Sequence, residues 1–258
     1  MQKLMSVVRR CIDDYQMIKE NDSIAVGVSG GKDSLALLCA LAGLREFYPL
    51  PFTLKAVTLD LGFGADFDPI RRYCDKIGVE LHIKETQIGK VVFEERKESN
   101  PCSMCSKMRR GALNEVAKSI GCDKIALGHH FDDAVETFML SLIYEGRISC
   151  FEPVTWLSRM EVTQIRPLLY LNEHSVASFA QRYELPIVKN PCPADSNTKR
   201  QEVKDLLSEL SLRYPGLKNR IFSSIQRLPL KGWEPFNYGR GRKCELDYSA
   251  AKEPSENK

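Results

Sequence analysis

Six consecutive residues at 29–34, with the sequence SGGKDS, have the composition of a loop that binds phosphate groups. Paired glycines let the backbone approach an anion closely, and amides at the start of a following helix would point at it. Lys32 can neutralise phosphate charge, and Asp33 can hold a magnesium ion. A plain strand-to-helix turn would explain the glycines but not the polar residues after them. The predicted phosphate-binding residues are Ser29, Gly30, Gly31, Lys32, Asp33 and Ser34.

A second group suited to chemistry is the pair Cys102 and Cys105, just before a helix expected at 108–120. Two thiolates at this spacing can share one metal ion or cluster. No second pair of this kind follows, and the next plausible ligand is Cys192, in a loop stiffened by a proline on each side. The alternatives are a redox-active pair, a structural zinc site with another ligand, and cysteines without a joint role.

The run GHHFDD at 128–133 is a third candidate, because it follows an apolar stretch that predicts a strand. Its carboxylates, Asp132 and Asp133, can bind magnesium or accept a proton from a reacting group. One of the two can equally cap the helix that follows. His129 and the histidine after it can also be interpreted as zinc ligands, although adjacent histidines point in different directions on most backbones.

Short apolar runs that alternate with longer helical segments predict an α/β fold. Helical crossovers imply a doubly wound, mostly parallel sheet, which is followed here by a small helical C-terminal region. In such sheets ligands bind beyond the carboxyl ends of the strands, where the runs at 29–34 and 128–133 fall. The expected strands are 24–28, 52–59, 79–85, 124–127, 162–165 and 186–188, and the expected helices are 1–20, 35–44, 67–77, 108–120, 132–144, 174–183, 198–211 and 217–228.

Basic residues are unevenly distributed along the chain. The 258 residues carry a net charge of +3, whereas residues 199–243 contain eleven lysines and arginines against four acids, a net of +7. This stretch indicates either an anionic partner or a solvated helical surface. We expect an N-terminal helix at 1–20, a main domain at 21–192, a basic helical region at 193–232 and a loose tail at 233–258.

Composition excludes several classes of protein. No run of about eighteen apolar residues is present to cross a membrane, and the start of the chain lacks the apolar core of a secretion signal. The cysteines number nine, and an odd count argues against a disulfide framework. We therefore expect a cytoplasmic protein without a membrane partner.

The run at 29–34 matches the PP-loop of the N-type ATP pyrophosphatases, which have an adenine nucleotide α-hydrolase-like fold. The loop alone does not name the substrate, because members of that superfamily activate many different oxygens. Further runs narrow the resemblance to the tRNA 2-thiocytidine synthetases, and together they extend over most of the chain. These runs lie at 102–111, 124–130, 136–138 and 165–168.

The resemblance implies an ATP-dependent tRNA sulfurtransferase. ATP would bind at the PP-loop together with Gly128 and His129, and the C2 oxygen of a cytidine would attack its α-phosphate. Asp132 or Asp133 would help with magnesium or proton handling, and Arg109 would offset charge that develops on the attacking oxygen. Sulfur would then replace the adenylated oxygen, and AMP would leave.

A 4Fe-4S cluster is also implied by the resemblance, with Cys102, Cys105 and Cys192 as its ligands. Three ligands leave one iron open, where a sulfide can bind for delivery. The implied partners are tRNA and a sulfur donor such as a cysteine desulfurase, and a homodimer is one option. One residue departs from the family, because Phe131 stands where its members usually carry arginine.

Two other functions fit parts of the pattern. A lysidine synthetase would use a similar PP-loop to adenylate a tRNA cytidine without sulfur transfer, but it would not need the three cysteines. A non-catalytic module that binds nucleotide or a cluster, and RNA, would account for the basic stretch at 199–243. Catalysis is favoured over a non-catalytic role by four residues that are expected in one crevice, namely Lys32, Asp33, Asp132 and Asp133.

Overall fold

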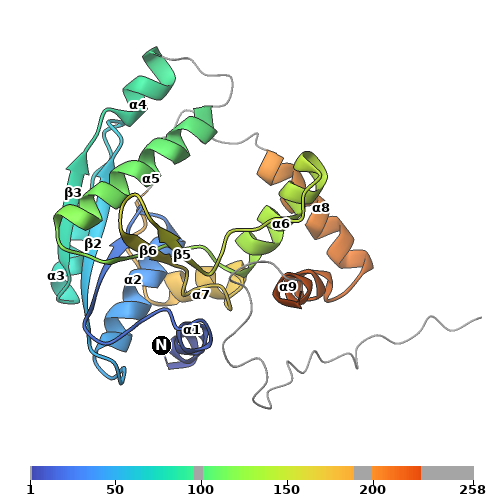
Figure 1. The fold of residues 1–258 in the computed structure, drawn as a ribbon, viewed down its shortest axis with the longest axis horizontal. Coiled ribbons are helices and arrows are strands. Elements are labelled where there is room, and N and C mark those ends of the chain that lie inside the picture. Colours follow the sequence, from blue (N-terminus) through green and yellow to red (C-terminus); the bar gives the residue numbers. More distant parts are fainter. Residues whose placement is uncertain (1, 96–100, 189–198, 228–258) are drawn as a thin grey trace, which may run out of the picture.

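The computed structural model describes residues 2–95, 101–188 and 199–227 (Figure 1). Its centre is a single six-stranded sheet, made of β1 (Asp22–Gly27), β2 (Phe52–Asp60), β3 (Glu80–Glu85), β4 (Lys124–Ala126), β5 (Val154–Leu157) and β6 (Val162–Ile165). The strands lie in the order β3-β2-β1-β4-β6-β5. Neighbours run parallel except at one edge, where β5 pairs antiparallel with β6.

Helices cover both faces of this sheet. They are α1 (Gln2–Asp14), α2 (Lys32–Arg45), α3 (Asp68–Lys76), the single turn α4 (Ile88–Lys90), the π-helical segment η1 (Val91–Glu95), α5 (Pro101–Ser119), α6 (Phe131–Glu145), α7 (Glu173–Arg182), α8 (Lys199–Arg213) and α9 (Leu217–Arg227). Helices α1, α2, α3 and α7 share one core, whereas α5 covers the opposite face (Figure 1).

Alternate residues of the central strand β1 point to opposite faces of the sheet. Ile24 and Val26 join the large core with α2, a helix that is buried along most of its length. Ala25 faces the other way and packs with Ile125 and residues of α5. Because both faces are covered, β1 is apolar at successive positions instead of alternating with polar residues.

The C-terminal helices α8 and α9 pack against α6. Leu207 of α8 and Phe222 of α9 are buried in the same core as the helices that cover the sheet. Figure 1 shows α6, α8 and α9 together on the side of the molecule away from β3. The helical C-terminal region is thus joined to the helix that begins with the aspartates at 132 and 133.

The fold class predicted from the sequence is confirmed, and most strands lie where they are expected. The strand expected at 186–188 is wrong, because Val188 N donates to Gly30 O (3.0 Å) and the backbone there is irregular. β5 was not expected, and it supplies the antiparallel edge. The helix expected at 1–20 is observed as α1, which ends at Asp14 shortly before Gln16 takes a left-handed conformation (φ 48°).

Helix α5 begins earlier than the sequence pattern indicates, at Pro101. Proline is favoured in a first helical turn, where its missing N–H has no helical partner. Met104 and Met108, four residues apart, pack against the small cluster formed by α4 and η1, which gives this part of α5 an apolar face. Cys102 and Cys105 therefore lie inside the helix, and their expected position before it is wrong.

Some expectations fall on residues that the structure does not describe. These are the third cysteine, Cys192, the domain boundary at 192–193 and the tail at 233–258, all of which stay predictions. Within the described ranges, no helix is both long and apolar enough to cross a membrane.

Candidate functional site

The turn between β1 and α2, here called the phosphate turn (residues 29–34), folds back on itself. Ser34 Oγ accepts a hydrogen bond from Ser29 N (3.1 Å) and donates one to Gly31 O (2.9 Å). Helix α2 then begins at Lys32, and no described side chain caps its start. Its first backbone amides are therefore suited to bind an anion.

Two glycines allow other parts of the chain to lie against the phosphate turn. Gly30 has φ +86°, a left-handed conformation, and a Cβ there would lie 3.0 Å from Val188 O. A Cβ on Gly128 would lie 3.1 Å from backbone atoms of Asp33 and Ser34. The turn after β4, here called the aspartate turn (residues 128–133), thus contacts the phosphate turn. The structure brings these two sequence-predicted groups together at the carboxyl ends of β1 and β4, a place here called the crevice because parallel sheets bind ligands there.

Lys32 and Asp33 of the phosphate turn form an ion pair, with 3.1 Å between Lys32 Nζ and Asp33 Oδ2. Lys32 Nζ also lies 3.3 Å from Glu173 Oε1. Burial lowers the pKa of Lys32, but the two carboxylates outweigh that effect and the pKa is raised. The other oxygen of Asp33, Oδ1, is buried without a hydrogen-bond partner among the described residues. An unsatisfied carboxylate oxygen suits a cation, so Asp33 fits the role of a magnesium ligand.

The aspartate turn starts α6 with a capping box centred on His130. Asp133 Oδ2 accepts a hydrogen bond from His130 N (2.9 Å), and Asp133 N donates to His130 Nδ1 (3.4 Å). The cap expected from an aspartate is therefore made by His130, and Asp133 completes it. The other ring nitrogen of His130 lies 3.8 Å from Asp33 Oδ1, which links the cap to the phosphate turn.

Asp132 is held by two partners from distant parts of the chain. Its Oδ2 accepts a hydrogen bond from Glu173 N (2.7 Å), and its Oδ1 contacts Lys218 Nζ (2.8 Å). Beside it, Phe131 packs on Phe222 of α9, with 4.8 Å between the ring centroids. The residue that replaces the family's arginine thus belongs to an aromatic contact that joins α6 to α9.

His129 carries a neutral imidazole. Its ring packs on Phe151 with 5.0 Å between centroids, and its Nδ1 is buried without a partner in the described part of the chain. Burial, and then the charges of Arg166 and Arg200, lower its pKa to about 3. Among the described residues, no three His, Cys, Asp or Glu side chains are grouped to hold a metal ion, so the zinc interpretation of the histidine pair gains no support.

Sequence reasoning missed Glu173, the first residue of α7. Its carboxylate bridges Lys32 and Lys204, with 2.7 Å between Lys204 Nζ and Glu173 Oε2. The hydrogen bond from Lys204 is the largest cause that lowers the pKa of Glu173 to about 2, and the charge of Lys32 adds to it. The only local signal was Asn172, which caps α7 by accepting a hydrogen bond from Ser175 N (2.8 Å).

Some basic side chains of the stretch at 199–243 form ion pairs within the protein. Arg200 and Lys204 of α8 and Lys218 of α9 contact carboxylates at the crevice. Arg220 and Arg227 of α9 are exposed. The two sequence interpretations of this stretch are therefore not exclusive, since it balances buried acids and also leaves basic side chains facing solvent.

Arg166, in the run at 165–168 that resembles the family, is buried behind the crevice. Its guanidinium donates to Thr155 Oγ1 (3.1 Å) and Gln164 Oε1 (3.4 Å). It also lies over the ring of Phe151, with 5.0 Å from Cζ to the centroid. Arg166 therefore holds Phe151 against His129 and shapes this wall of the crevice.

Cys102 and Cys105 lie one helical turn apart at the start of α5. Cys102 is exposed, whereas Cys105 is buried with residues of α4 and η1. Residues three apart on a helix lie close together on its surface, so one metal centre can be shared by two such cysteines. The pair thus fits two ligands of an iron–sulfur cluster. Cys192, the third predicted ligand, lies outside the described residues.

Arg109 lies on α5 one turn beyond Cys105 and is partly exposed. α5 is on the opposite face of the sheet from α2, and so approaches the crevice from the other side. The neighbouring Arg110 contributes, after burial and stronger charges, to the lowered pKa of His129. The charge of Arg110 is therefore felt at the aspartate turn, and the role of its neighbour Arg109 stays a prediction.

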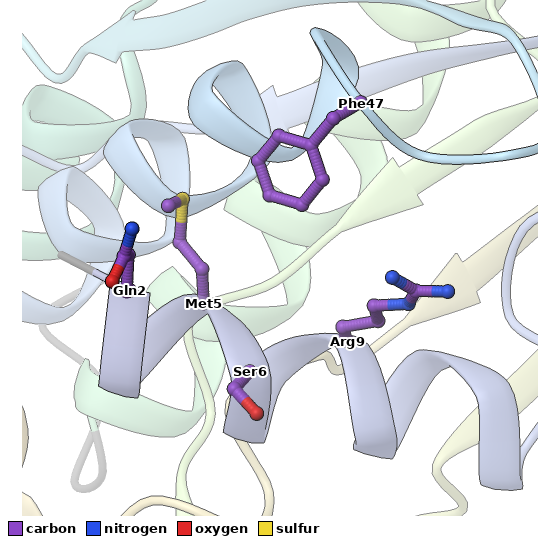
Figure 2. A pocket seen from close by; sticks show the side chains of 5 residues that line it. All are labelled: Gln2, Met5, Ser6, Arg9 and Phe47. Atoms are coloured by element: carbon purple, nitrogen blue, oxygen red, sulfur yellow. The ribbon is translucent and has the colours of Figure 1, made fainter.

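A separate hollow of about 400 Å³ lies between α1 and the segment after α2 (Figure 2). It is at the end of α2 opposite the phosphate turn, because Phe47 lies two residues beyond Arg45, the last residue of that helix. Hence it is distinct from the crevice. Its lining residues are Gln2, Met5, Ser6, Arg9 and Phe47.

The chain resembles known proteins over most of its length. The PP-loop domain family matches residues 3–210. The tRNA-cytidine(32) 2-sulfurtransferase of Pelobacter propionicus is 37% identical, over 88% of this chain and 86% of the relative. The protein of the same name from Dechloromonas aromatica is 40% identical, over 85% of this chain and 77% of the relative. The structure of the U34-tRNA thiolase NcsA from Methanococcus maripaludis, with its 4Fe-4S cluster, aligns with a TM-score of 0.72 at 30% identity, over 88% of this chain and 78% of that one.

Proposed function

The chain belongs to the PP-loop family of tRNA-cytidine(32) 2-sulfurtransferases, and we propose that it uses ATP to replace the C2 oxygen of a tRNA cytidine with sulfur. The observation that carries this proposal is the contact of Gly128 with the backbone of Asp33 and Ser34. That contact joins two of the family's motifs in one crevice, at the edge of the sheet where ligands bind.

ATP binds, in this proposal, with its phosphates on the phosphate turn, which is the PP-loop. The first amides of α2 hold the anion, and Lys32 neutralises part of its charge. Asp33 holds magnesium through the oxygen that lacks a protein partner among the described residues. Gly128 and His129 form the neighbouring wall.

The first proposed step joins the base to AMP. The C2 oxygen of the cytidine attacks the α-phosphorus of ATP, the bond to the β-phosphate breaks, and pyrophosphate leaves. Asp132 or Asp133 assists by binding magnesium or by accepting a proton. Arg109 offsets negative charge on the oxygens of the α-phosphate during the attack. Adenylation is needed because a carbonyl oxygen is a poor leaving group and AMP is a good one.

The second proposed step exchanges AMP for sulfur. A sulfur nucleophile adds at C2, and the C2–O bond breaks as AMP leaves. A 4Fe-4S cluster on Cys102, Cys105 and Cys192, when bound, supplies an iron with an open position for sulfur delivery. The start of α5 supports this assignment because it presents two thiols one helical turn apart.

The proposed substrate is tRNA, and the proposed partner is a sulfur donor such as a cysteine desulfurase in the cytoplasm. The names of the relatives support tRNA, and the exposed arginines of α9 support an RNA surface. A homodimer stays a prediction.

A ligase of the lysidine synthetase type is the competing function. It would share the adenylation step but would need no cluster, so the cysteine pair at the start of α5 favours sulfur transfer. Iron analysis of protein purified without oxygen separates the two. Sulfur transfer requires about four irons per chain, whereas the ligase requires none.

The deciding experiment compares tRNA nucleosides from cells with and without the gene. We expect mass spectrometry to show loss of 2-thiocytidine, restored by the wild-type protein but not by Lys32→Ala. Purified protein should release pyrophosphate only when tRNA is present. Unchanged 2-thiocytidine in cells without the gene would overturn the proposal, and absence of pyrophosphate release would favour a non-catalytic RNA module.

The RNA surface has its own test. Replacement of Arg220 and Arg227 by alanine should weaken tRNA binding and reduce the slope of log affinity against log salt by about two, roughly one for each lost phosphate contact. The matched control is the exposed pair Arg71 and Arg72 of α3, also changed to alanine, which should leave the slope unchanged. Equal slopes of log affinity against log salt for the two double variants would show that α9 does not form the RNA surface.

A further inference from the structure

Arg200, in the first turn of α8, reaches across to α6. Its Nη1 lies 3.3 Å from Asp133 Oδ1 and 3.2 Å from Glu136 Oε2, and its Nη2 donates to Thr137 Oγ1 (3.2 Å). One planar guanidinium thus binds three side chains from the first two turns of α6. Lysine has a single ammonium and cannot reproduce this geometry.

Glu136 depends on this contact because it is buried. Its side chain is 6% exposed, whereas that of Arg200 is 45% exposed. Burial raises the pKa of Glu136, and the like charge of Asp133 adds to the increase. The charges of Arg200 and, more weakly, Lys204 oppose it. Among the described residues, these three groups, from α6 and α8, are the charged neighbours with the largest effect on the pKa of Glu136.

Asp133 is fixed in orientation by the same guanidinium. One of its oxygens accepts a hydrogen bond from His130 N (2.9 Å), and the other pairs with Arg200. With both oxygens held, the carboxylate cannot rotate freely. The ring of His130 continues toward Asp33 Oδ1 at 3.8 Å. Polar contacts therefore join α8 to the aspartate turn, and the ring of His130 lies beside the phosphate turn.

We propose that Arg200 is a positioning residue of the adenylation site, which fixes the carboxylates of Asp133 and Glu136 at the start of α6. This inference rests on the proposed function, because it is the adenylation step that needs Asp133 in a defined place. Arg200 acts through these carboxylates and has no contact with the reacting atoms in this scheme. The C-terminal helix α8 is then part of the catalytic assembly as well as a neighbour of the RNA surface.

Loss of the guanidinium should leave Glu136 buried beside a like charge, so its pKa should rise further. The folded pKa then lies well above that of the unfolded chain, and ionisation of Glu136 lowers stability as the pH rises through the folded value. Arg200→Ala should therefore destabilise the protein more near pH 8 than near pH 5. In catalysis, the acid limb of the pH–rate profile should move to higher pH.

The first experiment measures tRNA-dependent pyrophosphate release against pH for Arg200→Ala, Arg200→Lys and wild type. We expect kcat to fall about ten- to a hundredfold in Arg200→Ala, because a misplaced group at an active site has losses of this order. The acid limb should shift upward, and Arg200→Lys should restore its position only in part. The control is Arg147→Ala, which breaks the exposed pair of Arg147 with Glu145 farther along α6 and should shift nothing.

The second experiment is a double-mutant cycle with Glu136→Gln. If Arg200 acts through these two carboxylates, the pH shift that Arg200→Ala causes should be smaller in a chain that already carries Glu136→Gln. The same cycle can be measured by urea unfolding near pH 5 and pH 8, which does not require an active enzyme. A shift of equal size in both backgrounds, in rate and in stability, would overturn the inference.

The two proposals fail in different ways. Wild-type protein that releases no pyrophosphate with any tRNA would overturn the proposed function, and the unfolding cycle would still decide whether Arg200 controls Glu136. Normal wild-type activity, together with an Arg200→Ala profile that matches Arg147→Ala, would overturn the role of Arg200 and leave the proposed function standing.

Discussion

The phosphate turn and the cysteine pair are supported by different parts of the fold. The phosphate turn follows the central strand β1 and is enclosed by the aspartate turn and Val188. Cys102 and Cys105 stand at the start of α5, where the packing is a separate small cluster that includes Val92. The main core therefore sets the geometry of one site, and a peripheral cluster sets that of the other.

This difference corresponds to the two steps of the proposed reaction. Adenylation requires fixed groups around the ATP phosphates, which a central, close-packed core can provide. Sulfur delivery depends on ligands that sit at a helix end, beside the core and not within it. Cysteine substitutions should therefore stop sulfur delivery and spare adenylation, whereas substitutions in the phosphate turn should stop adenylation and spare the bound iron.

Asp33→Ala should have the largest effect. We expect pyrophosphate release to fall at least about a hundredfold, because the variant removes a charged group that the proposed transition state needs. The melting temperature should stay close to that of wild type, since Asp33 is partly exposed and is not part of the hydrophobic core. Asp75→Ala, at an exposed site on α3, is the control for loss of an aspartate. Near-normal turnover in Asp33→Ala would remove the ATP site from this turn.

Cysteine variants should separate the two steps. Alanine at Cys102, Cys105 or Cys192 should abolish thiolation and the bound iron while tRNA-dependent pyrophosphate release continues, because the phosphate turn stands on a different core. Loss of both steps in all three variants would show that the two sites are not independent. The buried Cys39 and the part-buried Cys150, changed to alanine, are controls that should keep iron and thiolation.

A pair of glycines tests the contact between the two turns. Gly128→Ala should destabilise the protein by about 1–3 kcal/mol, because a Cβ 3.1 Å from the backbone of the phosphate turn overpacks that contact. ATP affinity should fall as well. Gly111→Ala, in α5 with open space around it, should stabilise by roughly 0.5–1 kcal/mol, as expected for alanine in a helix. Urea unfolding measures the stability of both variants, and ATP titration measures their affinity for ATP. Equal effects of Gly128→Ala and Gly111→Ala would contradict the close contact at Gly128.

His129 should give the smallest effect near neutral pH, because its contribution to the pH dependence of stability is seen only in acid. Its pKa of about 3 lies below the ordinary value of 6.5, so the unfolded chain binds the proton more readily between these values. Stability should fall as the pH drops from about 6.5 toward 3, and His129→Gln should reduce that dependence. His174→Gln, at an exposed position, controls for the loss of a histidine. Urea unfolding at several pH values measures this dependence of stability on pH. An unchanged dependence in His129→Gln would show that folding does not lower the pKa of His129.

Local sequence features were sufficient for the phosphate turn and for every described strand except β5. Paired glycines followed by a lysine and an aspartate identify a turn by themselves, and the strands that were predicted are each marked by an apolar run. The rule that ligands bind at the carboxyl ends of parallel strands then placed the aspartate turn beside it. The start of helix α5 was harder to predict, because its first turns are stabilised by contacts with η1 that no local sequence pattern indicates.

The ion pairs around the crevice could not be predicted, because they join residues far apart in sequence. Lys32 and Glu173 are separated by 141 positions, and Asp132 and Lys218 by 86. Each member looks like an ordinary surface charge in its own segment. Only the packing of α7, α8 and α9 against α2 and α6 brings these charges together.

These long separations also concern the order in which a ribosome makes the chain. β1, the phosphate turn and the aspartate turn are synthesised well before Glu173, Val188 and Lys218, which hold them in place. A nascent chain that lacks α7 to α9 can pair its first strands but cannot complete the crevice. We therefore expect ATP to stabilise the chain only after the last helices have been made, because a ligand stabilises only the states that bind it.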